Sequence, residues 1–417
     1  MKKILSFFLC AVMAFSLVSG TVFTESPLDI SIVSEAASYN KTMLPYCYKK
    51  LTDEEKLAYL KLRTAFIECR SSLDIEIPTA TMEKLSNILM YADVLTSFNY
   101  PVGDDSFEYY YYEDTAMTSK VMFKYLYSKK NYDLIIKKSD KAAEKVISQF
   151  TEKTTNYEKI KLIHDYIIDN TEYYNNNSNS SIYDALVKGR AKCDGYTHAF
   201  DYICAKAGIR TAVAYGYVKD RAGDNEYHVW NKVYYNKKWY NVDVTWDDPV
   251  NNLKDNRSYK YFMISDSTIS SSHVQTDRDF YVPAAKSEDG DYYRKYGYYA
   301  KTLNEAKSIL ADKIAEAAKN GGTFVTVRLA DEQLLNTVNK QFESTNDMFD
   351  ILDRASKKAG GKIITDGYLY ETDTDGYCTY TVYFYYTGTK LSDYFIDVSQ
   401  EDSDSISFLK ELGIKDA

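Results

Sequence analysis

The chain has 417 residues, with 60 acidic side chains against 51 basic ones and a net charge of −9. At about 150 residues per domain this length predicts two or three domains, and 45% hydrophobic with 27% charged residues exclude a wholly disordered chain. An acidic chain without a long Lys/Arg block is a poor match for a nucleic-acid-binding protein, so no nucleic-acid partner is expected.

The first segment predicts an export signal. Lys2-Lys3 precedes an apolar stretch over 4–18, which is too short to span a bilayer comfortably and typical of a signal-peptide h-region. We assign residues 1–37 to a signal peptide and leave its cleavage site open. Because no later apolar run reaches spanning length, we expect a secreted, extracellular or cell-surface-associated protein with no membrane span after signal removal.

The cysteines do not suggest a disulfide framework. Five remain after the signal segment, at Cys47, Cys69, Cys193, Cys204 and Cys378, so at least one thiol is unpaired in the monomer. Cys193 and Cys204 stand 11 residues apart on one predicted helix, about 16 Å along its axis, which is too far for a bridge. A disulfide between Cys47 and Cys69 stays open.

Three stretches follow the signal segment. A helical and Tyr-rich strand region is expected over 38–150, a mixed core over 151–285 and a C-terminal α/β domain over 300–417, the last folding as a separate unit. Hydrophobic periodicity predicts the individual elements. In the first stretch these are helices over 52–70, 82–95 and 140–150 with short strands inside 98–127. In the last they are helices over 303–317, 334–342 and 348–359, a strand over 325–329, and a hairpin of 362–370 with 377–386.

Residues suited to catalysis are concentrated between Cys193 and Pro249. Cys193 begins a predicted helix, His228 lies on a predicted strand, and Asp243 lies on the next strand. A helix start and a neighbouring imidazolium both stabilise a thiolate, which is the nucleophilic form of cysteine. An aspartate would orient the imidazole and stabilise its charged form. The pattern therefore predicts a Cys-His-Asp triad.

At these residues the sequence strongly resembles the transglutaminase-like superfamily, in particular its secreted bacterial members. The matching segments are a Cys-x-Gly-Tyr box at 193–196, a His-x-Trp-Asn strand at 228–231 and a Trp-Tyr-x-x-Asp-x-Thr-Trp-Asp-Asp-Pro strand at 239–249. The resemblance extends over about 156–263. It implies an α+β, papain-like core in which the nucleophile helix packs on an antiparallel sheet. Thr197-His198 departs from the family, where small residues are common, and would narrow the cleft floor.

The other histidines have simpler interpretations. His164 lies among isoleucines at helical spacing, which is typical of a buried core histidine. His198 lies about 140° around the helix from Cys193 and is not expected to be catalytic. His273 lies in a Ser-rich segment with no partner nearby in the sequence, so no role in catalysis is expected for it either.

Further residues surround the predicted triad. The backbone N–H of Cys193 is the natural first oxyanion donor, and Tyr183, Trp230 and Trp246 are candidates for substrate or oxyanion contacts. Asp247 and Asp248, with Asp243, could also form a cation site, but Asp-Asp-Pro favours a turn at the end of a strand. No metal and no cofactor are therefore expected.

Three functions remain open. Cys193 could form a thioester with a peptide or glutamine-type amide that water resolves, as in a peptidase or amidase. An amine could resolve it instead, which would cross-link proteins. The chain could also be a non-catalytic cell-surface binding module. We prefer hydrolysis, because excluding water demands more of a site, and we expect a protein or peptide partner in the cell wall or extracellular space.

The triad also makes a geometric prediction. Directly opposed residues of an antiparallel hairpin share a face. A loop of two or four residues, with Tyr234 opposite Trp239, places His228 and Asp243 on one face. A three-residue loop would send Asp243 to the other face and separate the triad.

Overall fold

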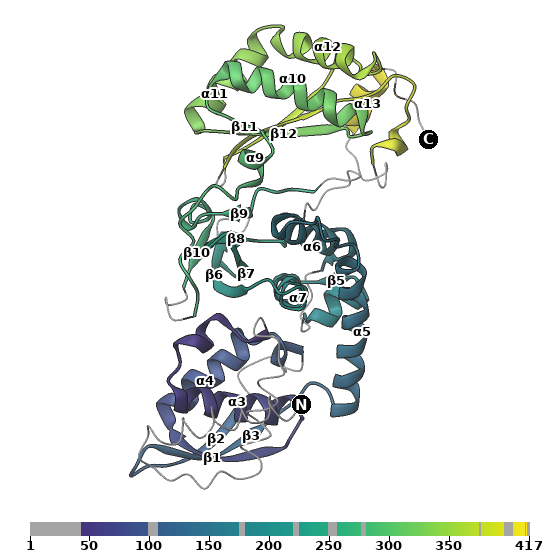
Figure 1. The fold of residues 1–417 in the computed structure, drawn as a ribbon. Coiled ribbons are helices and arrows are strands. Elements are labelled where there is room, and N and C mark those ends of the chain that lie inside the picture. The colour runs from purple at the N-terminus through teal and green to yellow at the C-terminus, as the bar shows by residue number, and fades with distance from the viewer. Residues whose placement is uncertain are drawn as a thin grey trace.

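The computed structural model describes residues 43–98, 107–174, 180–219, 225–248, 257–276, 281–374, 377–395, 403–412 and 414. The predicted signal peptide, Pro249 and residues 375–376 between the two predicted hairpin segments lie outside these residues. Within the described part, no helix combines the length and the apolar character that a membrane crossing needs. The described chain forms three bodies that follow one another in space as they do in sequence (Figure 1).

The N-terminal body packs helices on a three-stranded antiparallel sheet of order β1-β3-β2. Its elements are η2 (Tyr46–Lys50), α3 (Asp53–Ile67), β1 (Ser72–Pro78), α4 (Thr79–Tyr91), η3 (Thr96–Phe98), β2 (Phe107–Tyr112) and β3 (Met117–Phe123). A capping box between Thr52 and Glu55 begins α3. The predicted helices and Tyr-rich strands are confirmed in outline, whereas β1 was not predicted.

One helix prediction is wrong in its limits. The structure has α5 over Lys129–Ile147 rather than 140–150. Tyr132 and Ile135 in its first half are buried like Val146 in its second half. A lysine-rich surface between them interrupts the apolar pattern, although the helical spacing continues. This helix leads from the N-terminal body along the side of the central one (Figure 1).

The central body carries a five-stranded sheet of order β10-β6-β7-β8-β9, antiparallel throughout. Its elements are α6 (Asn156–Asn170), β4 (Glu172–Tyr173), η5 (Asp184–Lys188), β5 (Arg190–Ala191), α7 (Cys193–Lys206), β6 (Thr211–Lys219), β7 (Asn225–Tyr235), β8 (Lys238–Val242), β9 (Phe262–Ile264), α8 (Asp266–Ile269) and β10 (His273–Gln275). The helix α7 lies against β6 and β7 (Figure 1). The predicted α+β core, a helix begun by Cys193 on an antiparallel sheet, is confirmed.

The C-terminal body has its own apolar core between helices and a sheet of order β11-β12-β14-β13. Its elements are α9 (Tyr292–Lys295), β11 (Tyr299–Ala300), α10 (Leu303–Lys319), β12 (Phe324–Leu329), α11 (Glu332–Ser344), α12 (Asp347–Ala359), β13 (Leu369–Asp373), β14 (Cys378–Tyr383), η6 (Leu391–Asp393) and α13 (Ser403–Glu411). The predicted helices, strand and hairpin are all present, the hairpin with shorter strands.

The C-terminal body docks on the central one through Tyr377, whose ring packs on a buried cation. Arg328 pairs with Asp291, and its guanidinium lies 3.9 Å from the centre of the Tyr377 ring. Tyr377 in turn belongs to the apolar cluster of Trp230 and Tyr261 in the central body. Independent folding of this segment stays a prediction: it has its own core, but it also covers part of the central one.

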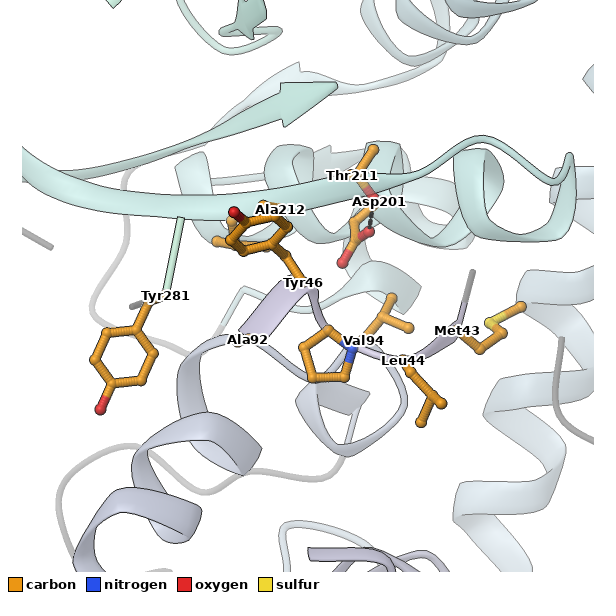
Figure 2. Close-up of a pocket in the computed structure, with 11 residues that line it drawn as sticks. Met43, Leu44, Tyr46, Ala92, Val94, Asp201, Thr211, Ala212 and Tyr281 are labelled. Atoms are coloured by element: carbon orange, nitrogen blue, oxygen red, sulfur yellow. Dashed lines mark hydrogen bonds between the residues drawn. The ribbon is translucent and has the colours of Figure 1, made fainter. Parts of the chain in front are cut away.

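A small cavity lies between the N-terminal and central bodies. Its volume is about 10 Å³, close to the minimum for one water molecule. Tyr46 and Val94 line it from one side, and Ala212, Asp201 and Thr211 from the other, the last two joined by a hydrogen bond (Figure 2). The residues that line it do not include Cys193, His228 or Asp243, so the candidate active site lies elsewhere.

Candidate active site

The hairpin of β7 and β8 sets the relation between His228 and Asp243. Tyr234 pairs with Trp239 and Tyr235 with Lys238, so the loop has two residues, 236 and 237. Both are left-handed, with φ of 46° and 64°, as a tight hairpin turn of this kind requires. The predicted loop with an even number of residues, and with Tyr234 opposite Trp239, is confirmed. Asp243 follows directly after β8.

His228 and Asp243 form a buried pair. His228 Nε2 lies 2.6 Å from Asp243 Oδ2, and the two residues are only 4% and 0% exposed. The other carboxylate oxygen, Oδ1, accepts the backbone N–H groups of Thr245 and Trp246 at 3.0 and 3.1 Å. The backbone of the turn after β8 therefore fixes the carboxylate.

The electrostatics of this pair favour charged forms. Burial alone lowers the pKa of His228, but the charge and hydrogen bond of Asp243 and the side chain of Cys193 raise it to about 10. Burial alone raises the pKa of Asp243, yet His228 and His273 hold it well below its usual range. The two shifts agree with an imidazolium bound to a carboxylate.

Cys193 begins α7, and its side chain acts on the pKa of His228 together with Asp243. Because Nε2 of His228 faces Asp243, Nδ1 is the ring nitrogen available to the Cys193 sulfur. Two hydrogen bonds tie α7 to the strand of His228: Thr197 Oγ1 donates to the Val229 carbonyl at 2.9 Å, and Asn231 Nδ2 donates to the Thr197 carbonyl at 3.1 Å. Thr197, which departs from the small residues common in the family, therefore bonds the helix to the strand.

Gly195 and Ser180 shape the start of α7. Ser180 Oγ accepts the backbone N–H groups of Lys192 and Gly195 at 2.7 and 3.2 Å, which satisfies two donors at the helix start. A Cβ atom on Gly195 would lie 2.5 Å from the Cβ of Ala191 and 2.6 Å from Ser180 Oγ. Glycine in the Cys-x-Gly-Tyr box therefore permits this close approach.

The expected surroundings of His273 are wrong, whereas the absence of a catalytic role stays a prediction. It does not lie in an unpartnered loop: it begins β10, which pairs with β6, and its Nε2 lies 2.9 Å from Asp243 Oδ2. Burial is the main reason that the pKa of His273 is lower than usual. The partner is 30 residues away in sequence, so local sequence could not reveal it. The available signal was Gly216, a glycine inside an apolar strand, which is typical of a close backbone approach.

His228, Asp243 and His273 are the one group of three potential metal ligands within the described residues, with donor atoms within 4.8 Å of one another. Both imidazole nitrogens lie at hydrogen-bond distance from the same carboxylate oxygen, so hydrogen bonds account for the arrangement. That the site needs no metal stays a prediction.

The other acidic residues have partners of their own. Asp247 Oδ2 lies 3.2 Å from Nε2 of His164, and Asp248 Oδ2 accepts the hydroxyl of Tyr196 at 2.5 Å. The alternative of a cation site from the three aspartates is therefore not supported. His164 is fully buried and hydrogen-bonded, as predicted for a core histidine.

The three candidate substrate contacts are placed differently. Trp230 is buried, and its indole N–H donates to Asn241 Oδ1 at 3.0 Å, so it is not available to a substrate. The Tyr183 hydroxyl accepts from Lys138 at 3.4 Å. Trp246 lies closest to the triad, with its ring centre 5.9 Å from that of His228.

The thiols separate into two groups. None of the five described cysteines forms a disulfide, so the Cys47–Cys69 disulfide is absent from the structure. Cys47 and Cys204 are buried, and burial raises the pKa of Cys47 to about 12 and that of Cys204 well above its usual value. Cys193 is partly exposed and packs beside Val213, Tyr215 and Val229.

Comparison with known proteins identifies the same segment. The family model of the transglutaminase-like superfamily matches residues 140–244. The kyphoscoliosis peptidases of Mus musculus and Homo sapiens are each 34% identical to this chain over 70 residues, 15% of this chain and 11% of the relative, so the chain spans about a tenth of their length. A solved TGase structure covers 48% of this chain and 54% of that chain at 14% identity, with a TM-score of 0.25. Residues 140–244 are therefore similar to the transglutaminase-like superfamily, and this segment holds Cys193, His228 and Asp243.

Proposed function

We propose that the protein is a secreted cysteine hydrolase that acts on peptide or glutamine-type amide bonds through an acyl-enzyme on Cys193. The contact of His228 Nε2 with Asp243 Oδ2 at 2.6 Å, beside a thiol at a helix start, carries the proposal. That constellation stabilises a thiolate and positions an acid for the leaving group.

In the first half of the reaction the Cys193 thiolate attacks the carbonyl carbon and a C–S bond forms. The backbone N–H of Cys193 is the expected first donor to the resulting oxyanion. The His228 imidazolium gives its Nδ1 proton to the departing nitrogen, the C–N bond breaks, and ammonia or an amine leaves. Asp243 keeps the imidazole oriented throughout.

In the second half a water molecule resolves the thioester. Neutral His228 takes a proton from the water, the oxygen attacks the acyl carbon, and the C–S bond breaks to return the thiolate with an imidazolium. The partial exposure of Cys193 supports access of water, and therefore hydrolysis over transfer to an amine.

The test is incubation of the protein with a glutamine-donor peptide, with and without a primary amine, followed by mass spectrometry. We expect loss of ammonia with gain of water in both samples, and no reaction for Cys193→Ala. If an amine adduct forms instead, the proposed function changes from hydrolysis to protein cross-linking. No change in a range of peptides, with Cys193 unmodified, would favour a binding module.

The apolar stretch after Lys2-Lys3 supports the proposed export. N-terminal sequencing of the protein from the culture medium should find a chain that begins after this stretch. Intact protein confined to cells would contradict secretion.

A further inference from the structure

A second histidine reaches the carboxylate that holds His228. Asp243 Oδ2 lies 2.6 Å from Nε2 of His228 and 2.9 Å from Nε2 of His273. All three residues are buried. Because a carboxylate only accepts, each contact is a hydrogen bond if the imidazole nitrogen carries a proton.

The other neighbours of His273 indicate which nitrogen is protonated. Its Nδ1 lies 2.8 Å from the hydroxyl oxygen of Ser272, a group that can donate to it. Since Asp243 can only accept, Nε2 carries the single proton of a neutral ring, and Nδ1 is left to accept from Ser272. The charges that act on His273 are those of Asp243, His228 and Lys260.

Aromatic rings surround this imidazole and exclude water from it. The ring centres of Trp246, Trp230 and Tyr261 lie 4.7, 5.1 and 5.2 Å from that of His273. A second proton on His273 would place two imidazolium rings beside one carboxylate, with ring centres 5.4 Å apart. Burial and this repulsion both favour the neutral form.

We propose that His273 is a positioning residue of the active site: as a neutral imidazole it donates Nε2–H to Asp243, fixes the carboxylate and limits how tightly His228 holds its proton. The inference rests on the proposed function, because it assigns regulation of the same site. A carboxylate that bound His228 alone would hold the imidazolium proton more strongly than one shared with His273. The sharing matters because His228 must release its proton to the leaving group.

The fold delivers His273 through a glycine opposite His228. Gly216 of β6 pairs with His228 on one side and with Gln275 of β10 on the other. A Cβ atom at position 216 would lie 2.1 Å from the carbonyl oxygen of Val274. Only glycine lets β10 pair closely enough for His273 to reach the carboxylate.

Nuclear magnetic resonance of the full chain labelled with ¹⁵N-histidine tests the proposal, because the chain has only four histidines. After dialysis against EDTA, we expect His273 at pH 7 as the neutral Nε2–H form and His228 protonated on both nitrogens. The proposal would be overturned if His273 were doubly protonated or carried its proton on Nδ1. It would also be overturned if the histidine resonances changed when EDTA removed a bound cation.

Two variants separate positioning from packing. His273→Leu should raise the deprotonation midpoint of His228 by about 0.5 to 1 pH unit, because Asp243 then binds that imidazolium alone. At pH 7 His228 is protonated in both proteins, but the carboxylate that orients its ring is no longer fixed in the variant, so iodoacetamide labelling of Cys193 should slow about tenfold. His273→Gln, which can place an amide N–H at the Nε2 position, should restore both values. A folded His273→Leu protein with an unchanged midpoint would contradict the proposal, as would a Gln variant that behaves like Leu.

The control is His198→Leu, a buried histidine on α7, which should leave the His228 midpoint unchanged. The NMR titrations of His228 and His273 can be measured even if Cys193 proves unreactive. Loss of the proposed function and loss of this inference are therefore distinguishable.

Discussion

The central body holds two buried histidine–carboxylate clusters with opposite composition. In one, the carboxylate of Asp243 lies between two histidines, His228 and His273. In the other, the ring of His164 lies between two carboxylates, with Nδ1 3.1 Å from Asp165 and Nε2 3.2 Å from Asp247.

The two clusters show that burial and pairing do not by themselves make a candidate active site. Burial lowers the pKa of His164, and its two carboxylates outweigh that effect and raise it, much as Asp243 does for His228. Only His228 adjoins a thiol at the start of a helix. We therefore assign a structural role to the His164 cluster and the chemistry to the Asp243 cluster.

The largest expected difference between the clusters is in thiol reactivity. Asp243→Asn should slow the reaction of Cys193 with iodoacetamide at pH 6 by about a thousandfold, because the amide cannot stabilise the imidazolium. Asp247→Asn should change that rate by less than about threefold, although it loses a buried hydrogen bond worth about 1–3 kcal/mol of unfolding free energy. Equal losses in the two variants would contradict the assignment.

Substrate turnover should also depend more on the Asp243 cluster than on the His164 cluster. Once a substrate is found, Asp243→Ala should reduce turnover less than Cys193→Ala, since orienting a base matters less than supplying the nucleophile. Steady-state rates of the two variants, beside Asp247→Ala, measure this directly.

The next difference is in the pH dependence of stability. The pKa of His164 is raised by folding, so its stabilisation is present below about pH 6.5 and is lost as the pH rises through the raised value. The pKa of His273 is lowered by folding, so its native state loses stability as the pH falls below about 6.5. The two histidines should therefore act with opposite signs.

Denaturant unfolding between pH 5.5 and 8 measures these signs. Relative to wild type, His164→Gln should be most destabilised at the acid end and recover by about 1 kcal/mol as the pH rises. His273→Gln should instead improve relative to wild type by a similar amount as the pH falls. Parallel slopes in the two variants would mean that both histidines are in the same charge state.

A smaller effect on Cys193 labelling is expected when the pairing of β10, the strand that carries His273, is disturbed. Gly216→Ala would press β10 away from β6, since its Cβ would lie 2.1 Å from the Val274 carbonyl oxygen. We expect Cys193 labelling to slow about fivefold, approaching the His273→Leu value. Gly290→Ala is the control: its Cβ would lie 2.7 Å from the Tyr240 ring, so it should cost stability but leave labelling unchanged.

Sequence predicted the parts of the site that depend on local rules. The hairpin parity follows from two-residue periodicity, and α7 follows from its apolar spacing, so Cys193, His228 and Asp243 could be placed before the structure.

Contacts between distant segments could not be predicted in the same way. His273 reaches Asp243 through the order of strands in the sheet, and Ser180 reaches the start of α7 from a preceding loop. Neither depends on local periodicity. The strand β1 was not predicted, and it pairs with β3 rather than with a sequence neighbour.

One measurement tests the central claim most directly: labelling of the full chain with limiting iodoacetamide at pH 6, followed by peptide mapping of the five described thiols. Cys193 should be labelled first, and its labelling should be lost in His228→Ala, because the imidazolium stabilises the thiolate. Faster labelling of Cys69 or Cys378, or unchanged Cys193 labelling in His228→Ala, would contradict the claim that His228 activates Cys193.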